Sequence, residues 1–204
     1  MLKKTLIKGI AALSLSAVAA TAMANEPIIS AGSAVTEQIH ALEQQNQLVA
    51  GDVTSELPQD LELPKIGYHR RLSSEGLMAL NPTRLIGSDE MGPETSLSQL
   101  KTAGVEVDIV NTLPTPEGLL ERIDEIAALT DSQKNAEALK AEVNQQISSL
   151  EKNKAQNKEP KKVLFLLIHE GRPANVAGAS TTPNAIIELA GGINPAASNP
   201  AYLP

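Results

Sequence analysis

The chain has 204 residues, with 17 Lys and Arg against 24 Asp and Glu, and it contains no cysteine. The lack of cysteine excludes a disulfide framework and thiolate chemistry. The net charge of −7 argues against a nucleic-acid or anionic-lipid partner, because such partners need a basic surface.

Residues 1–24 have the three parts of a secretory signal peptide. Three lysines open the segment, residues 9–20 are apolar, and Ala22 and Ala24 supply the small residues of a cleavage site. The apolar run is too short to span a bilayer, so we expect cleavage before Asn25; an uncleaved anchor is the alternative. Cleavage would remove the three lysines and leave 14 basic against 24 acidic side chains, a charge of −10.

Residues 25–115 alternate between short apolar runs and helix-start signals, which predicts an N-terminal α/β lobe with a parallel sheet. The expected strands are 28–30, 48–50, 85–87 and 105–110, and the expected helices are 33–42, 73–80 and 93–103. Ser33 is a plausible N-cap, as is Ser73 or Ser74, and Gly104 suits a helix C-terminus. Residues 66–72 are expected to be extended.

Residues 116–160 are predicted to form a helical connector. Thr115 and Pro116 are typical of a helix start, and this first helix should run to Leu129. A second helix should extend to about Gln156, with apolar residues three and four positions apart: Ala136, Leu139, Val143, Ile147 and Leu150. About 25 residues at ~1.5 Å each give a rod of ~38 Å, which we expect to resist hinge bending.

Residues 161–204 begin a second α/β unit. Residues 163–168 (VLFLLI) are typical of a strand buried on both faces, and a helix is expected between Thr182 and Gly191. One strand and one helix cannot bury both faces of that strand, so we expect a partial, truncated C-terminal lobe. A natural protein of one and a half lobes is the alternative.

Residues 67–76 (GYHRRLSSEG) carry the clearest chemical signal. They place one of only two tyrosines, Tyr68, beside a histidine and two arginines. A phenol oxygen is a suitable ligand for ferric iron, and arginine matches carboxylates, so the segment indicates a site for an iron compound with acid groups. Alternatively, the tyrosine ring packs on the lobe and its hydroxyl bonds to the backbone. In an extended segment only one of Arg70 and Arg71 would face a cleft, and His69 would point away from Tyr68.

Other chemistry has little support in the sequence. There is no phosphate-binding loop and no supported Ser/His/Asp arrangement, so catalysis is not predicted, although an exported enzyme stays an alternative. Three scattered histidines fall short of the three or four converging ligands that a zinc or manganese carrier needs.

The order of elements and several motifs resemble the periplasmic haem-binding proteins of bacterial haem ABC importers. The matching stretches are 33–37 (SAVTE), 67–76 (GYHRRLSSEG), 80–82 (LNP), 86–93 (IGSDEMGP) and 181–192. The resemblance spans nearly all of residues 27–204 and implies an α/β fold of two Rossmann-like lobes joined by a long rigid helix. It departs at Tyr202, where the family continues into a fuller second lobe, and so it also implies truncation.

The resemblance further implies roles for individual residues in carrying ferric haem as a transported ligand. Tyr68 would be the axial ligand of the iron, and Arg70 would support it or bind a propionate. Arg172 is a weaker propionate candidate. His169 would hold a second, stacked haem, as is thought for some members; alternatively it only borders the cleft. A carrier of cobalamin or a ferric siderophore on the same scaffold stays an alternative.

The resemblance also implies partners and a location. The protein would be periplasmic and monomeric, would deliver haem to an inner-membrane haem ABC permease, and would serve an outer-membrane haem receptor system indirectly. Glu94 matches the acid that docks on permease arginines, and Glu90 is the second candidate. An ordinary acid at a helix N-terminus, worth ~0.3–1 kcal/mol, is the alternative for Glu94.

Overall fold

The computed structural model describes residues 26–56 and 61–203, so the predicted signal peptide lies outside the described residues. The strands are β1 (Ile28–Ala31), β2 (Leu48–Gly51), β3 (Arg84–Gly87), β4 (Glu106–Ile109), β5 (Leu166–Leu167) and β6 (Asn175–Val176). The α-helices are α1 (Ser33–Ala41), α2 (Ser74–Met78), α3 (Glu94–Thr102), α4 (Pro116–Leu129), α5 (Gln133–Gln156) and α6 (Thr182–Leu189), and short 3₁₀ turns are η1 (Gln45–Gln47) and η2 (His69–Arg71).

The N-terminal lobe is built on a parallel sheet with the strand order β2-β1-β3-β4. Both faces of the sheet are covered. One core joins Ile28 and Ile86 to buried residues of α1 and α4, and a second core joins Ile29 and Leu85 to α2 and α3. Burial on both faces explains the short apolar runs of β1 and β2, whereas the edge strand β4 (EVDI) alternates and is only partly buried. The predicted parallel α/β lobe is confirmed.

Most of the predicted helix ends are present. The side chains of Ser73 and Thr115 each accept a hydrogen bond from the backbone N–H three residues on, at 3.3 and 3.0 Å. Gly104 follows α3 with a φ of 90°. The prediction for Ser33 is wrong: Gly32, with a φ of 107°, is the cap, and Ser33 is the first helical residue without a side-chain cap bond. A φ in this range favours glycine and lets the chain turn sharply at the end of β1.

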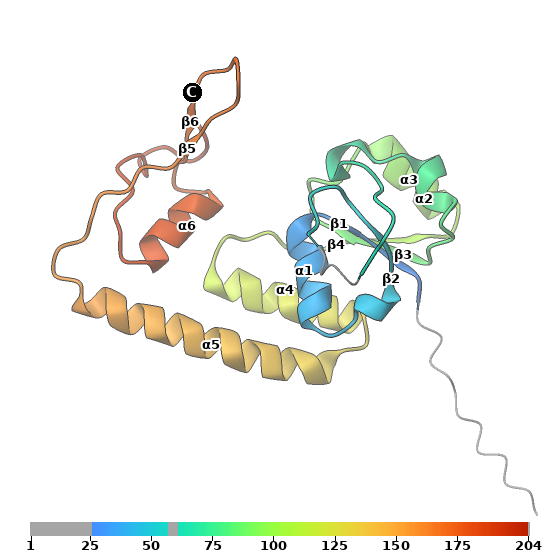
Figure 1. Ribbon diagram of the computed structural model, residues 1–204, viewed down its shortest axis with the longest axis horizontal. Helices are drawn as coiled ribbons and strands as arrows, with labels where there is room; N and C mark the ends of the chain where they lie inside the picture. The colour runs from blue at the N-terminus through green and yellow to red at the C-terminus, as the bar shows by residue number, and fades with distance from the viewer. Residues whose placement is uncertain (1–25, 57–60, 204) are drawn as a thin grey trace, which may run out of the picture.

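Helix α5 joins the two lobes. It has 24 residues, or ~36 Å at 1.5 Å per residue, and Figure 1 shows it running beneath both lobes. Near its start, Asn135 Nδ2 donates to Leu42 O of the first lobe at 2.7 Å. Just after its end, Asn157 Nδ2 donates to Gly191 O of the second lobe at 3.2 Å. The predicted fold, two α/β lobes on a long helix, is confirmed. Among the described residues, no helix has the length and apolar composition to cross a membrane.

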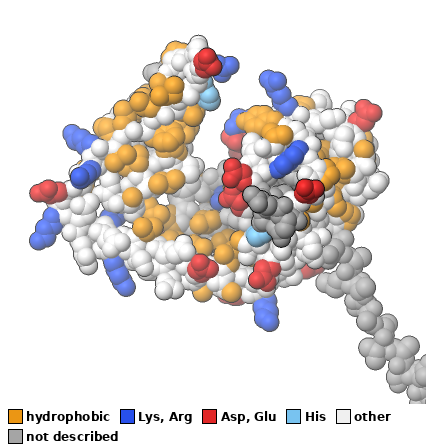
Figure 2. Space-filling model, in the orientation of Figure 1, with side chains coloured by type: hydrophobic (Ala, Val, Ile, Leu, Met, Phe, Trp, Pro, Cys, Tyr) orange, Lys and Arg blue, Asp and Glu red, His pale blue; other side chains and the backbone are white. Residues whose placement is uncertain are grey.

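The second lobe differs from the prediction. Residues 163–168 do not form one strand: Lys162 forms a parallel bridge with Ile193, and β5 forms an antiparallel pair with β6. The predicted burial on both faces is also wrong, because Phe165 is 39% exposed and Ile168 is 71% exposed. The reason is that the described residues do not cover this segment on both sides. Hydrophobic side chains gather over this lobe in Figure 2.

Candidate ligand-binding cleft

A cleft of about 750 Å³ lies between the two lobes, and the surface is hollowed there in Figure 2. This volume is typical of small-molecule and cofactor sites. The first lobe contributes the loops that follow its four strands, β1 to β4. Helices α4 and α5 contribute further side chains, and α6 of the second lobe forms the facing wall. The carboxyl edge of a parallel sheet, where the strand order reverses between β1 and β3, is the usual ligand site of this architecture.

Tyr68 lies on the wall of this cleft, immediately before η2. Its side chain is 41% exposed. Its hydroxyl forms no hydrogen bond with any residue that the structure describes. Among the described residues, Tyr68 therefore lacks the backbone hydrogen bond of the packed tyrosine that the sequence left open.

His69 also lines the cleft, and the expectation that it points away from Tyr68 is wrong. The two rings have centroids 4.4 Å apart and are tilted by 54°. Residues 69–71 form a 3₁₀ turn instead of an extended segment, closed by Arg71 N donating to Tyr68 O at 2.7 Å. The turn brings His69 Nδ1 to 2.7 Å from Oδ2 of the buried Asp52. Because a buried carboxylate needs partners, this contact fixes the backbone beside Tyr68.

Asp52 is fully buried just after β2. Besides His69, it accepts hydrogen bonds from Ser55 Oγ at 2.7 Å and from Thr54 Oγ1 at 2.8 Å. Burial acts to raise the pKa of Asp52, but the hydrogen bonds from Ser55, His69 and Thr54 outweigh it and lower the pKa. Asp52 is therefore a carboxylate at neutral pH, and it ties the loop after β2 to the tyrosine turn.

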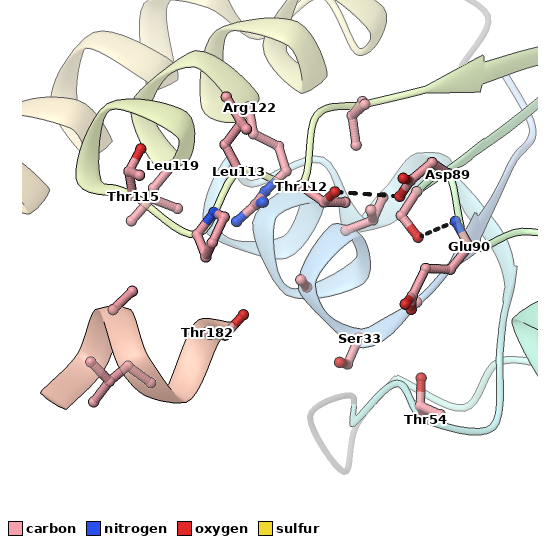
Figure 3. A pocket seen from close by; sticks show the side chains of 18 of the residues that line it. Ser33, Thr54, Asp89, Glu90, Thr112, Leu113, Thr115, Leu119, Arg122 and Thr182 are labelled. Atoms are coloured by element: carbon pink, nitrogen blue, oxygen red, sulfur yellow. Dashed lines mark hydrogen bonds between the residues drawn. The ribbon is translucent and has the colours of Figure 1, made fainter. Parts of the chain in front are cut away.

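Arg70 forms an ion pair with Glu90, and both side chains are about half exposed. Glu90 lines the cleft, whereas Arg70 does not. An exposed ion pair contributes little to stability, so Arg70 can exchange Glu90 for a ligand at small cost. Asp89, the neighbouring acid on the wall, accepts a hydrogen bond from Thr112 Oγ1 at 3.3 Å (Figure 3).

The other predicted site residues are not among the residues that line the cleft. His169 and Arg172 are exposed in the turn after β5 and do not line it. Glu94 is the exposed first residue of α3, on the helix layer that covers the opposite face of the sheet from α4. Of the predicted residues, only Tyr68 and Glu90 line the cleft.

Sequence reasoning missed Arg122, which lines the cleft, and Asp52, which is buried against the cleft residue His69. Asp52 directly follows a strand, at the edge where ligands bind, and that position could have indicated it. Arg122 lies on α4 beside the buried Ile123. In the sequence, a charged residue next to the apolar face of a helix could have indicated it. Among the described residues, no group of three or more His, Asp or Glu side chains could hold a bare metal ion.

The fold and the cleft define the class of protein: a two-lobed α/β binding protein whose lobes are connected by a long helix. The family model described as periplasmic binding protein matches residues 28–202. The chain belongs to the periplasmic binding protein family.

Solved and curated proteins of this family are similar to the chain. The periplasmic haem-binding protein HutB of Vibrio cholerae is 56% identical, with a TM-score of 0.84 over 88% of this chain and 70% of that one. The periplasmic haem-binding protein BhuT, solved with two haems, is 32% identical, with a TM-score of 0.79 over 87% and 69%. The vitamin B12-binding protein of Vibrio parahaemolyticus is 25% identical over 186 residues, which are 89% of this chain and 66% of that protein. The chain thus spans about two thirds of the length of these relatives.

Proposed function

We propose that this protein captures ferric haem in the periplasm, after cleavage of its signal peptide, and delivers it to an inner-membrane ABC importer. The observation that carries the proposal is the exposed Tyr68, which lines a cleft at the carboxyl edge of a parallel sheet and whose hydroxyl has no hydrogen-bond partner among the described residues. The likeness to haem-binding HutB, at 56% identity, supports haem over cobalamin, since the B12-binding relative is 25% identical. The protein acts as a carrier and not as an enzyme.

In this proposal, Tyr68 is the axial ligand. A phenolate oxygen is an established axial ligand of haem iron. Arg70 leaves Glu90 and either supports the phenolate or binds a propionate, since arginine matches carboxylate geometry. Because the turn from Tyr68 to Arg71 is held by Asp52 through His69, the ligand oxygen needs little reorganisation when haem enters.

A second haem is proposed to bind against His169, with Arg172 of the same turn near a propionate. The relative BhuT, solved with two haems, supports the binding of two haems by a protein of this kind. His169 follows β5 and is exposed, so its ring is accessible to a ligand. A neutral histidine nitrogen is a common ligand of haem iron.

Titration with hemin tests the proposal. The wild-type chain is expected to give a saturable ferric-haem absorption band, with no comparable change on addition of cyanocobalamin. Two haems per chain are expected, and His169→Ala should reduce the number to one. If the chain binds cyanocobalamin tightly and does not bind hemin, the proposed cargo would be a corrinoid instead of haem. If His169→Ala still binds two haems, His169 does not hold the second haem, and the proposal of haem binding at Tyr68 stands.

Glu94 is proposed to dock on the permease, because it is an exposed acid at the start of α3. Glu90 is not proposed for docking, since it lines the cleft and pairs with Arg70. Glu94→Lys should slow hemin transfer to the reconstituted haem permease by about tenfold at low salt, because opposite charges steer association. Hemin affinity should not change.

The matched control is Glu117→Lys, which reverses an exposed acid in the first turn of α4. It should transfer hemin at the wild-type rate. If both variants slow hemin transfer equally, the change in net charge explains the slowing and Glu94 has no specific role. If Glu94→Lys does not slow transfer, docking through this residue is ruled out.

A further inference from the structure

Arg122 is the one Lys or Arg side chain that lines the cleft in the part of the chain that the structure describes. Figure 3 shows it extending from α4 with its guanidinium group beside Leu113 and Thr112, on the cleft side of the helix. Its Nε donates to Gln38 Oε1 at 3.1 Å and its Nη1 donates to Asn111 O at 3.2 Å. Both acceptors are neutral, so they orient the group without neutralising its charge.

The remaining N–H groups of Arg122 have no acceptor among the described residues. The two acids of the cleft wall are engaged elsewhere, Glu90 with Arg70 and Asp89 with Thr112. Glu125, the acid nearest in the sequence, accepts from Asn111 N at 2.8 Å. The cleft therefore contains an oriented guanidinium group with free donors.

The charge on Arg122 is held at a cost. Burial lowers the pKa of Arg122, and the nearby Glu125 offsets this in part. Arginine stays charged in proteins, so the shift expresses a penalty for keeping a cation half-buried without a carboxylate partner. A ligand that brings a carboxylate into the cleft would remove this penalty.

We propose that Arg122 binds a carboxylate of the cargo and thereby selects porphyrins with free propionates over corrinoids, whose corresponding side chains are mostly amides. This inference rests on the proposed haem-binding function. The planar guanidinium fork matches a carboxylate in two parallel hydrogen bonds, which an amide cannot accept equally well. The apolar side chains of the same cleft, among them Leu119, Ile147 and Ile186, suit the ring of a porphyrin.

Hemin and hemin dimethyl ester, which lacks the two acid groups, are the probes. The wild-type chain should bind hemin more tightly than the ester. Arg122→Gln should weaken hemin binding by roughly 10-fold to 100-fold, as expected for a lost hydrogen bond to a charged group, and should leave ester binding unchanged. Arg122→Lys, which keeps the charge but not the fork, should lie between. Lys101→Gln, on the exposed surface of α3, removes the same charge and should change neither affinity.

The comparison of the two ligands separates the possible failures. If Arg122→Gln weakens hemin and the ester equally, the residue has only a structural role and the inference is overturned. If wild type and Arg122→Gln bind hemin equally, the carboxylate contact is overturned while haem binding stands. If the wild-type chain binds neither ligand, the proposed function fails and this inference fails with it.

Discussion

Tyr68→Phe is expected to weaken hemin binding by at least tenfold, about 1.4 kcal/mol, and to change the ferric-haem absorption spectrum. The substitution removes one oxygen from a side chain that lines the cleft and leaves its ring beside His69. The fold should be unaffected, because the Tyr68 hydroxyl makes no hydrogen bond to any described residue. Absorption spectra during hemin titration measure both effects.

The chain supplies a matched control in its only other tyrosine. Tyr202 is similarly exposed, at 42% against 41% for Tyr68, and it does not line the cleft. Tyr202→Phe should therefore keep the wild-type spectrum and affinity. A wild-type spectrum in Tyr68→Phe would exclude Tyr68 as the axial ligand, whatever happens to affinity.

Asp52→Ala is expected to lower the free energy of unfolding by roughly 3 kcal/mol, because it leaves buried donors without an acceptor. His69, Ser55 and Thr54 all donate to this carboxylate. Hemin affinity should fall as well, since His69 would no longer hold the turn beside Tyr68. Urea unfolding followed by circular dichroism measures the stability, and hemin titration measures the site.

The control for this variant is Asp124→Ala, at an exposed position on α4, which should change stability little. Equal stability of Asp52→Ala and wild type would contradict a supporting role for the buried carboxylate. Loss of stability with unchanged hemin affinity would separate Asp52 from the positioning of Tyr68.

The lowered pKa of Asp52 also fixes the direction of a pH effect. The pKa of Asp52 is lower in the folded state than in an unfolded chain, where it is about 3.9. The ionised carboxylate therefore stabilises the folded state fully when the pH is above about 3.9. The stabilisation is lost as pH falls through the folded-state pKa. When the pH is lowered from 7 to ~2, the free energy of unfolding should fall more in wild type than in Asp52→Ala. An equal fall in both proteins would contradict the lowered pKa of Asp52.

The sequence by itself determined the features that depend on neighbouring residues. Ser73 and Thr115 cap helices because their hydroxyls reach an N–H three residues on. The spacing of apolar residues gave α5 its place and nearly its full length, and short apolar runs gave the parallel sheet. Tyr68 was singled out as a candidate ligand-binding residue from its neighbours in residues 67–76 alone.

Tertiary structure alone decided which buried polar groups pair with the cleft residues His69 and Arg122. Asp52 and His69 are 17 residues apart, and Arg122 and Gln38 are 84 apart, so no local pattern pairs them. The 3₁₀ turn of residues 69–71 places His69 Nδ1 2.7 Å from the buried Asp52 and keeps its ring beside Tyr68. The apolar run 163–168 predicted burial, but burial depends on what packs over a strand, and the described residues leave that segment exposed.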